Sequence, residues 1–154
     1  MSLHWRISAA GFSWPMSTIT KQYGATGDIP VPADYDADGK TDYTVWRPSN
    51  GTFYVIQSSN GQHVSTAYGT TGDIPATHLA SIYTFDRHIA NFDGDRKADI
   101  GVFQPSNGTW YVIASSTGQS ITQAYGTNGD LIVPGDYDGD RKTDYAVFRP
   151  SNGT

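Results

Sequence analysis

Three short segments of the chain carry most of its acidic side chains in one repeated spacing. All fifteen acidic residues are Asp, and eleven of them lie in Asp loop 1 (34–42), Asp loop 2 (91–99) and Asp loop 3 (136–144). Positions 1, 3, 5 and 9 of these loops carry side-chain oxygens, on Asp34, Asp36, Asp38 and Asp42, on Asn91, Asp93, Asp95 and Asp99, and on Asp136, Asp138, Asp140 and Asp144. Carboxylates this close repel one another, and a bound cation relieves that repulsion. The spacing therefore predicts cation sites.

Calcium is the cation that this set of ligands favours. It takes six to eight oxygen ligands, and the chain has no Cys and no cluster of His that would favour zinc or copper. A backbone carbonyl at position 7 would add one ligand in each loop, from Lys40, Lys97 and Lys142. We expect up to three Ca²⁺, one in each loop. The loops are not EF-hands, because Val45, Val102 and Val147 stand where that motif has its Glu.

Two of the differences between the loops bear on ion binding and on the shape of the turn. Gly39 stands at position 6 of loop 1, where the other loops have Arg96 and Arg141. Asn91 replaces an Asp at position 1 of loop 2, so this site has one charge fewer and is expected to bind its ion more weakly. The alternative interpretation of all three loops is that their aspartates only initiate turns and cap one another.

The loops belong to an internal repeat with a period of 45 residues. A block that starts with Tyr-Gly begins at residues 23, 68 and 125, and a Pro-Ser-Asn-Gly-Thr block begins at residues 48, 105 and 150. The second copy has 12 extra residues between Pro75 and Ala90. Residues 5–8 match residues 53–56, so the N-terminal segment belongs to the same scheme.

Each period predicts four short strands, because runs of β-branched and aromatic residues alternate with turn residues. In the first full repeat these runs are residues 29–33, 42–47, 52–57 and 62–68. Asn50-Gly51 and Asn60-Gly61 are typical of two-residue hairpin turns. Four antiparallel strands at this period predict an all-β fold, and in particular a β-propeller built of four-stranded blades.

We expect one propeller segment with three blades, one of which is split between the two ends of the chain. Residues 1–24 would supply the third and fourth strands of the split blade, and residues 127–154 its first and second strands. Residues 25–69 form the first full repeat, and residues 70–126 form the second repeat with its insertion. Two such chains would close a ring of six blades, so a homodimer is expected.

The Asp-x-Asp-x-Asp loops, in register with one period, resemble the FG-GAP/VCBS-type repeat family. The resemblance covers essentially the whole chain. It implies loops that bind calcium between the first two strands of propeller blades, as in integrin-like and fungal-lectin-like propellers. The Phe-Gly and Gly-Ala-Pro signature of the family is degenerate in this sequence.

Other recurring residues have less specific interpretations. Asp28, Asp73 and Asp130 each follow a glycine and are expected to fix a turn. Arg47 and Arg149 recur with Gln104 in register between them, either as surface positions or as partners in hydrogen bonds between blades. The insertion carries the apolar residues Leu79, Ile82, Tyr83, Phe85 and Ile89. It is expected either to pack across a blade or subunit boundary or to form a lip that faces a ligand.

Composition narrows the class of function. The net charge of −5 argues against a nucleic-acid partner, and no apolar run is long enough to span a membrane. No nucleophile–base pair stands out, so we expect a protein that is not an enzyme. The sequence predicts a secreted or cell-surface calcium-binding propeller that acts as a lectin-like or adhesion module for a glycan or protein ligand. The alternative is a structural or accessory module of a larger secreted protein, one that carries an enzyme elsewhere, with no activity of its own.

Overall fold

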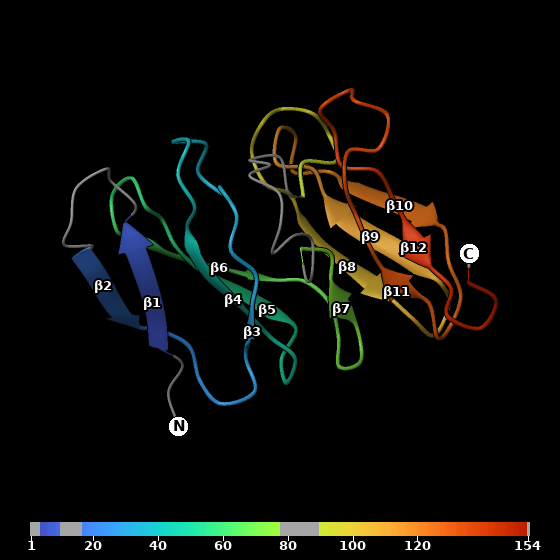
Figure 1. Cartoon of the computed structure of the whole chain (residues 1–154), viewed down its shortest axis with the longest axis horizontal. Coiled ribbons are helices and arrows are strands. Elements are labelled where there is room, and N and C mark those ends of the chain that lie inside the picture. Colours follow the sequence, from blue (N-terminus) through green and yellow to red (C-terminus); the bar gives the residue numbers. More distant parts are fainter. Residues whose placement is uncertain (1–3, 10–16, 78–89, 154) are drawn as a thin grey trace.

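The chain folds into antiparallel β-sheets (Figure 1). The computed structural model describes residues 4–9, 17–77 and 90–153. The strands are β1 (His4–Ala9), β2 (Ser17–Gln22), β3 (Ile29–Pro30), β4 (Tyr43–Arg47), β5 (Thr52–Ile56), β6 (His63–Ala67), β7 (Ile74–Pro75), β8 (Ile100–Gln104), β9 (Thr109–Ile113), β10 (Ser120–Ala124), β11 (Leu131–Ile132) and β12 (Val147–Phe148). Within these residues there is no helix, and hence none that could cross a membrane. The predicted all-β class is confirmed.

Two four-stranded sheets have the same strand order. One pairs β3-β4-β5-β6 and the other pairs β7-β8-β9-β10, each strand beside its neighbour in sequence. Two-stranded sheets, β1–β2 and β11–β12, lie at opposite ends of the molecule, so the sheets form an open row in chain order (Figure 1). The predicted four-stranded antiparallel units are therefore present, and no ring closes among the described strands.

The pairing of the third and fourth strands keeps one register throughout the chain. Phe53 lies opposite Thr66 in one sheet and Trp110 lies opposite Gln123 in the next. In the N-terminal hairpin Trp5 lies opposite Lys21, which is likewise two residues before the tyrosine of the Tyr-Gly block. The hairpin β1–β2 is thus paired as β5–β6 and β9–β10 are.

The expected two-residue hairpin turns are wrong. Four residues, 48–51, connect β4 to β5, and residues 57–62 connect β5 to β6. At the first of these turns two backbones approach each other closely. The Gly51 carbonyl accepts the Tyr68 amide at 2.7 Å, and a Cβ on Gly51 would lie 2.1 Å from the Gly69 oxygen.

The first strand of each repeat is shorter than predicted. β3 covers two residues instead of residues 29–33, because Pro30 and Pro32 have no amide hydrogen to donate to the ladder. Two backbone hydrogen bonds nevertheless continue the pairing, from Val31 to Thr44 at 2.9 Å and from Asp42 to Ala33 at 2.8 Å. These bonds lead directly into Asp loop 1 and hold its two ends together.

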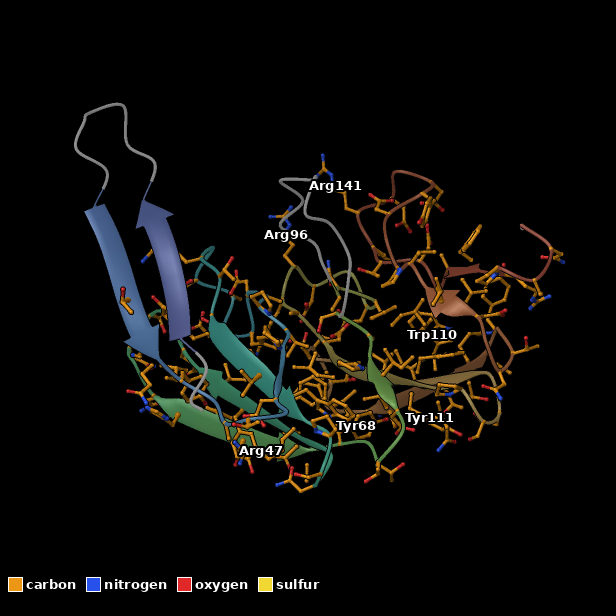
Figure 2. The ribbon with its side chains drawn as sticks, turned by 60° about the horizontal axis from the view of Figure 1, so that its bottom comes forward. Arg47, Tyr68, Arg96, Trp110, Tyr111 and Arg141 are labelled. Atoms are coloured by element: carbon orange, nitrogen blue, oxygen red, sulfur yellow. The ribbon has the colours of Figure 1, made fainter. Side chains whose placement is uncertain are left out.

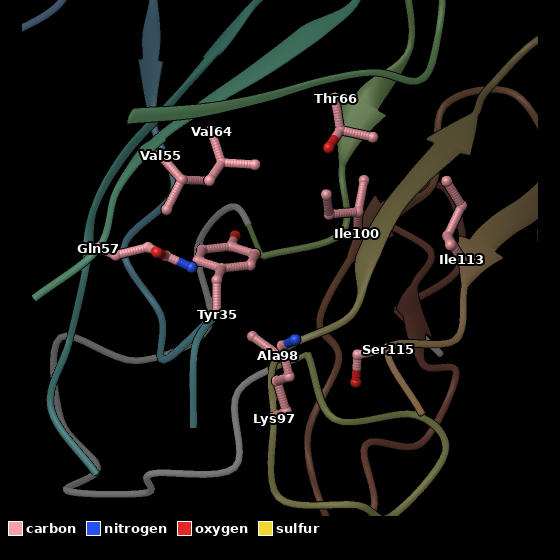
Figure 3. A pocket seen from close by; sticks show the side chains of 10 residues that line it. All are labelled: Tyr35, Val55, Gln57, Val64, Thr66, Lys97, Ala98, Ile100, Ile113 and Ser115. Atoms are coloured by element: carbon pink, nitrogen blue, oxygen red, sulfur yellow. The ribbon is translucent and has the colours of Figure 1, made fainter. Parts of the chain in front are cut away.

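The core consists of large side chains that point from the central strands into the space between sheets. Trp46, Phe53, Phe103 and Trp110 are fully buried. These sheets enclose a cavity of about 200 Å³. Figure 3 shows Val55 and Val64 on one side of it, Ile100 and Ile113 on the other, and Tyr35 between them. The two four-stranded sheets therefore pack face to face, which places their Asp loops side by side.

Candidate metal centres

The Asp loops connect the first and second strands of successive sheets and lie beside one another. The Ala98 amide at position 8 of loop 2 donates to the Asp34 carbonyl at position 1 of loop 1, at 2.7 Å. The Thr143 amide makes the same bond from loop 3 to the Asn91 carbonyl, at 2.9 Å. Figure 2 shows Arg96 and Arg141, one from each of loops 2 and 3, at the same end of the molecule. The loops thus form one hydrogen-bonded row.

Asn91 has a role that an aspartate could not fill. Its side-chain nitrogen donates to the Arg141 carbonyl in loop 3 at 3.2 Å, whereas a carboxylate has no donor for this bond. Its side-chain oxygen accepts the amides of Gly94 at 2.9 Å and Arg96 at 3.3 Å. The Asp-to-Asn difference in loop 2 therefore links two neighbouring loops.

All three loops have the same backbone conformation although their glycines differ in position. Positive φ angles occur at positions 4 and 6 of each loop, at Ala37 (66°) and Gly39 (81°), at Gly94 (87°) and Arg96 (75°), and at Gly139 (85°) and Arg141 (70°). Residues in this left-handed conformation turn backbone amides toward the inside of the loop, where they can hold an anion. The conformation thus favours an inward-facing side-chain oxygen at position 1 of every loop.

Each loop brings three carboxylates together. The groups are Asp34, Asp36 and Asp42, then Asp93, Asp95 and Asp99, then Asp136, Asp138 and Asp144, and the oxygens of each group lie within 4.8 Å of one another. These three groups could bind a metal ion. Asp38 and Asp140, predicted as ligands at position 5, are outside the groups of their loops. The Lys40, Lys97 and Lys142 carbonyls remain predicted ligands, while the amides of these residues donate to the position-5 carboxylates at 2.8 Å.

Backbone amides inside the loops already bond to the carboxylates. In loop 1 the Asp34 carboxylate accepts the amides of Ala37 at 2.7 Å and Gly39 at 2.9 Å. The equivalent bonds in loop 3 reach Asp136 from Gly139 at 2.7 Å and Arg141 at 3.0 Å. The aspartates therefore do cap the turns, as the alternative interpretation expects. A carboxylate has about four lone-pair sites, so turn capping still leaves sites for a cation.

Serines that follow the third strand were missed as members of the site. Ser58 Oγ donates to Asp38 at 2.9 Å and Ser59 Oγ donates to Asp36 at 2.6 Å. In the next sheet Ser115 Oγ donates to Asp95 at 2.9 Å and Ser116 Oγ to Asp93 at 2.7 Å. The signal was present in the sequence, because a Ser-Ser pair follows the third strand in both full repeats.

The pKa values within a loop move in opposite directions. Burial raises the pKa of Asp42 and of Asp99, the position-9 carboxylates, above the ordinary value of 3.8. Burial also acts to raise the pKa of Asp36, but hydrogen bonds from Ser59 and from the Asp38 amide outweigh it and the pKa is lowered. In loop 2, burial likewise acts to raise the pKa of Asp93, but hydrogen bonds from Ser116 outweigh it and the pKa is lowered. Loops 1 and 2 thus each pair a carboxylate that is stabilised in its charged form with one whose charge burial opposes. A cation would favour the charged form of both.

The aspartates that follow glycine fix turns, as predicted. The amides of Ala25, Thr70 and Thr127 donate to Asp28, Asp73 and Asp130 at 2.8, 2.9 and 2.9 Å. Of the two interpretations of Arg47 and Arg149, surface positions or hydrogen bonds between blades, the ion pairs that the described residues show support neither directly. Each arginine pairs with an aspartate of its own repeat. Leu79, Ile82, Tyr83, Phe85 and Ile89 of the insertion lie outside the described residues.

No protein-family model, curated protein or solved structure matches the chain. The resemblance to FG-GAP/VCBS-type repeats accordingly stays a prediction that rests on the loops and the period. The candidate site is defined by the geometry of the three loops alone.

Proposed function

We propose that the chain is a calcium-binding β-repeat module of the propeller type that serves to bind a glycan or protein partner. The proposal of calcium binding rests on one observation. Each of the three loops holds a group of three carboxylates, all three loops have the same backbone conformation, and hydrogen bonds join them in one row. A single turn with aspartates would need no such repetition. The ligand atoms are all oxygens, which suit a hard cation such as calcium.

The bound ions would stabilise the folded structure. A cation at Asp36 and Asp42 neutralises charge in a loop whose two ends are held by β3 and β4 and whose carboxylates contact the turn after β5. Because each loop is bonded to the next, order in one loop supports order in its neighbour. An ion that binds only the folded loops stabilises the fold by about 2.7 kcal/mol when its concentration is 100 times its Kd.

Partner binding is expected on surfaces other than the calcium loops. Carboxylates that are occupied by backbone amides, serine hydroxyls and an ion have few free sites for a ligand. The alternative function is a structural or accessory module of a larger secreted protein. The two differ in whether the isolated chain binds a ligand, which a glycan array in calcium and in chelator measures.

Calcium binding is tested by titration calorimetry and by thermal melting in calcium and in chelator. We expect melting to rise with millimolar calcium, and we expect Asp36→Asn, Asp93→Asn and Asp138→Asn, the position-3 changes of the three loops, each to remove one binding event. Asp93→Asn should have the smallest effect, because loop 2 has Asn91 and one charge fewer. The control is Asp73→Asn, which makes the same change outside the loops.

An unchanged melting temperature in calcium, together with no heat of binding, would contradict the proposal. If calcium binding and the rise in melting temperature were reduced equally in the Asp73→Asn control and in the loop variants, calcium would not act through the loops. Magnesium at the same concentration is a further comparison, because it demands a more regular octahedral site and gives up its water ligands reluctantly.

A further inference from the structure

One salt bridge recurs at the same place in two repeats. Arg47 Nε and Nη2 donate to the two carboxylate oxygens of Asp28, both at 2.8 Å. Arg149 makes the same pair of bonds to Asp130, also at 2.8 Å. In both pairs the aspartate carboxylate is almost fully buried. The first and third repeats thus each contain a binding site for a guanidinium group, here called the receptor, and the repeat's own arginine occupies it.

The receptor in the first repeat has a second wall. The Arg47 guanidinium lies over the Tyr54 ring, 4.5 Å from its centroid. Asn50 holds the ring in place, because its side-chain nitrogen donates to the Tyr54 hydroxyl at 3.0 Å. A carboxylate on one side and an aromatic face on another suit a planar cation, which bonds at its edge and stacks on its face.

The middle repeat keeps this receptor and lacks the arginine. Thr70 positions Asp73 as Ala25 positions Asp28, by an amide bond of 2.9 Å, and Asn107 holds Tyr111 as Asn50 holds Tyr54, at 3.0 Å. Gln104 stands where the arginine would be, and its side-chain oxygen instead accepts a bond from Asn107 at 2.7 Å. Among the described residues, Oδ1 of Asp73 has no hydrogen-bond partner.

A cavity lies at this position. Its volume is about 200 Å³, and Tyr68, Asp73, Val102, Gln104 and Tyr111 are among the residues that line it. Figure 2 shows Tyr68 and Tyr111 on the same side of the molecule, near the connection that leads from β6 to β7. A cavity of this size admits a group of several heavy atoms, since one water occupies about 30 Å³ of liquid.

We propose that the cavity at Asp73 binds a guanidinium group carried by a ligand, which takes the place that Arg47 and Arg149 occupy in the other repeats. The Asp73 carboxylate accepts two parallel bonds from the group, and the Tyr111 ring lies against its planar face. The class of ligand is an arginine side chain of a partner polypeptide or a small guanidinium compound.

The site is expected to bind a guanidinium group in preference to other groups. A lysine ammonium is a compact point charge that cannot make two parallel bonds and stack at once. A metal ion needs several oxygen ligands, and among the described residues Asp73 is the one carboxylate that lines the cavity. A neutral urea group of the same shape lacks the charge that a lone carboxylate favours.

The direct test is an NMR titration of the full chain in calcium buffer with N-acetyl-arginine methylamide. A single ion pair and stack bind weakly, so the expected Kd is on the order of millimolar. We expect the shifts to centre on residues 68–73 and 102–111, and we expect the citrulline and lysine counterparts to bind at least tenfold more weakly. Methylguanidinium alone serves as the second probe. If the arginine derivative binds more tightly than methylguanidinium, the ligand is an arginine side chain of a polypeptide. If the two bind equally, the ligand is a small guanidinium compound.

Three variants make the test specific. Asp73→Asn should weaken binding at least tenfold, because it keeps the shape and removes the charge. Gln104→Arg should close the site with an arginine from the chain itself, abolish binding and raise the melting temperature. Arg47→Gln should open a second site at Asp28 and Tyr54, so that shifts appear there as well.

Binding of the citrulline derivative as tightly as the arginine derivative would overturn the proposal. So would unchanged binding in folded Gln104→Arg protein, which is the variant least expected to lose stability. The site is separate from the Asp loops, so these results are independent of the calcium stoichiometry. A failure of the calcium proposal would likewise leave the titration at Asp73 unaffected.

Discussion

At the scale of single residues, the left-handed positions shape the Asp loops. Positions 4 and 6 have positive φ in all three loops, and three of these six residues are not glycine, namely Ala37, Arg96 and Arg141. A residue with a Cβ is strained there by about 1–2 kcal/mol. The chain tolerates this strain because the amides of these turns bond to the position-1 side chains.

We expect Ala37→Gly to stabilise the protein. Gly94 and Gly139 already occupy position 4 of the other loops, and glycine removes the strain of a φ of 66° at a smaller cost in chain entropy. The net gain should be about 0.5–1 kcal/mol, measured by denaturant unfolding.

The matched control is Ala67→Gly on β6, where the backbone is extended and the same substitution should cost about 0.5–1 kcal/mol. If both substitutions destabilise equally, position 4 carries no strain and the account of the loop backbone is wrong.

At the scale of elements, Asp loops 1 and 2 each depend on the turn that follows the third strand of the same sheet. The Ser58 amide donates to Asp42 at 2.7 Å, and the Ser115 amide donates to Asp99 at 2.7 Å. The hydroxyls of the two Ser-Ser pairs add four bonds to loop carboxylates. A hairpin turn therefore holds the loop that connects the first two strands, and the two parts of the sheet order one another.

Ser59→Ala tests this link between turn and loop. It removes the 2.6 Å bond to Asp36, which is one cause of the lowered pKa of that carboxylate. In chelator we expect a loss of about 0.5–1.5 kcal/mol in the free energy of unfolding, measured by urea titration.

Ser65→Ala, at an exposed position of β6, is the control and should change the free energy of unfolding by less than about 0.5 kcal/mol. A Ser59→Ala protein as stable as this control would show that the turn does not support the loop.

At the scale of the whole molecule, the terminal sheets expose side chains whose counterparts are buried. Phe148 on β12 is 43% exposed, whereas its repeat counterparts Trp46 and Phe103 are 0% exposed. Tyr137 is 69% exposed, and its counterpart Tyr35 is 6% exposed. Among the described strands β12 pairs with β11 alone, so its other edge is unpaired. An unpaired strand edge beside exposed apolar side chains favours association with another chain. Because β1–β2 has the register of β5–β6, it is the hairpin expected to cover that edge.

We expect two copies of the chain to form a dimer in which the β1–β2 hairpin of each copy pairs with β12 of the other. Within one copy the two sheets lie at opposite ends, so they do not meet (Figure 1). Light scattering in calcium buffer should give about twice the 16.7 kDa of one chain. Deletion of residues 1–22 and the substitution Phe148→Asp should each give a monomer.

Thr122→Asp, which places the same charge on exposed β10, should leave the dimer intact. A mass of one chain for the unaltered protein, at concentrations well above micromolar, would contradict the expected assembly.

The sequence by itself determined the central strands and the Asp loops, because these features depend on neighbouring residues. Runs of aromatic and β-branched residues predicted β4 and β5 to within one residue at each end. The spacing of the aspartates predicted which carboxylates share a loop. The lengths of the hairpin turns were predicted wrongly. At the first of these turns Gly51 approaches Gly69, which follows a later strand, and neighbouring residues alone do not reveal this contact.

Only the tertiary structure decided how residues far apart in sequence meet. Ser116 lies 23 residues from Asp93, and Thr143 lies 52 residues from Asn91, and each pair is joined because sheet pairing or loop stacking brings them together. The same packing pairs Arg47 with Asp28, 19 residues away, and leaves Asp73 beside a glutamine that is held by Asn107. Spacing along the chain carries local preferences, whereas these contacts follow from the packing of whole sheets.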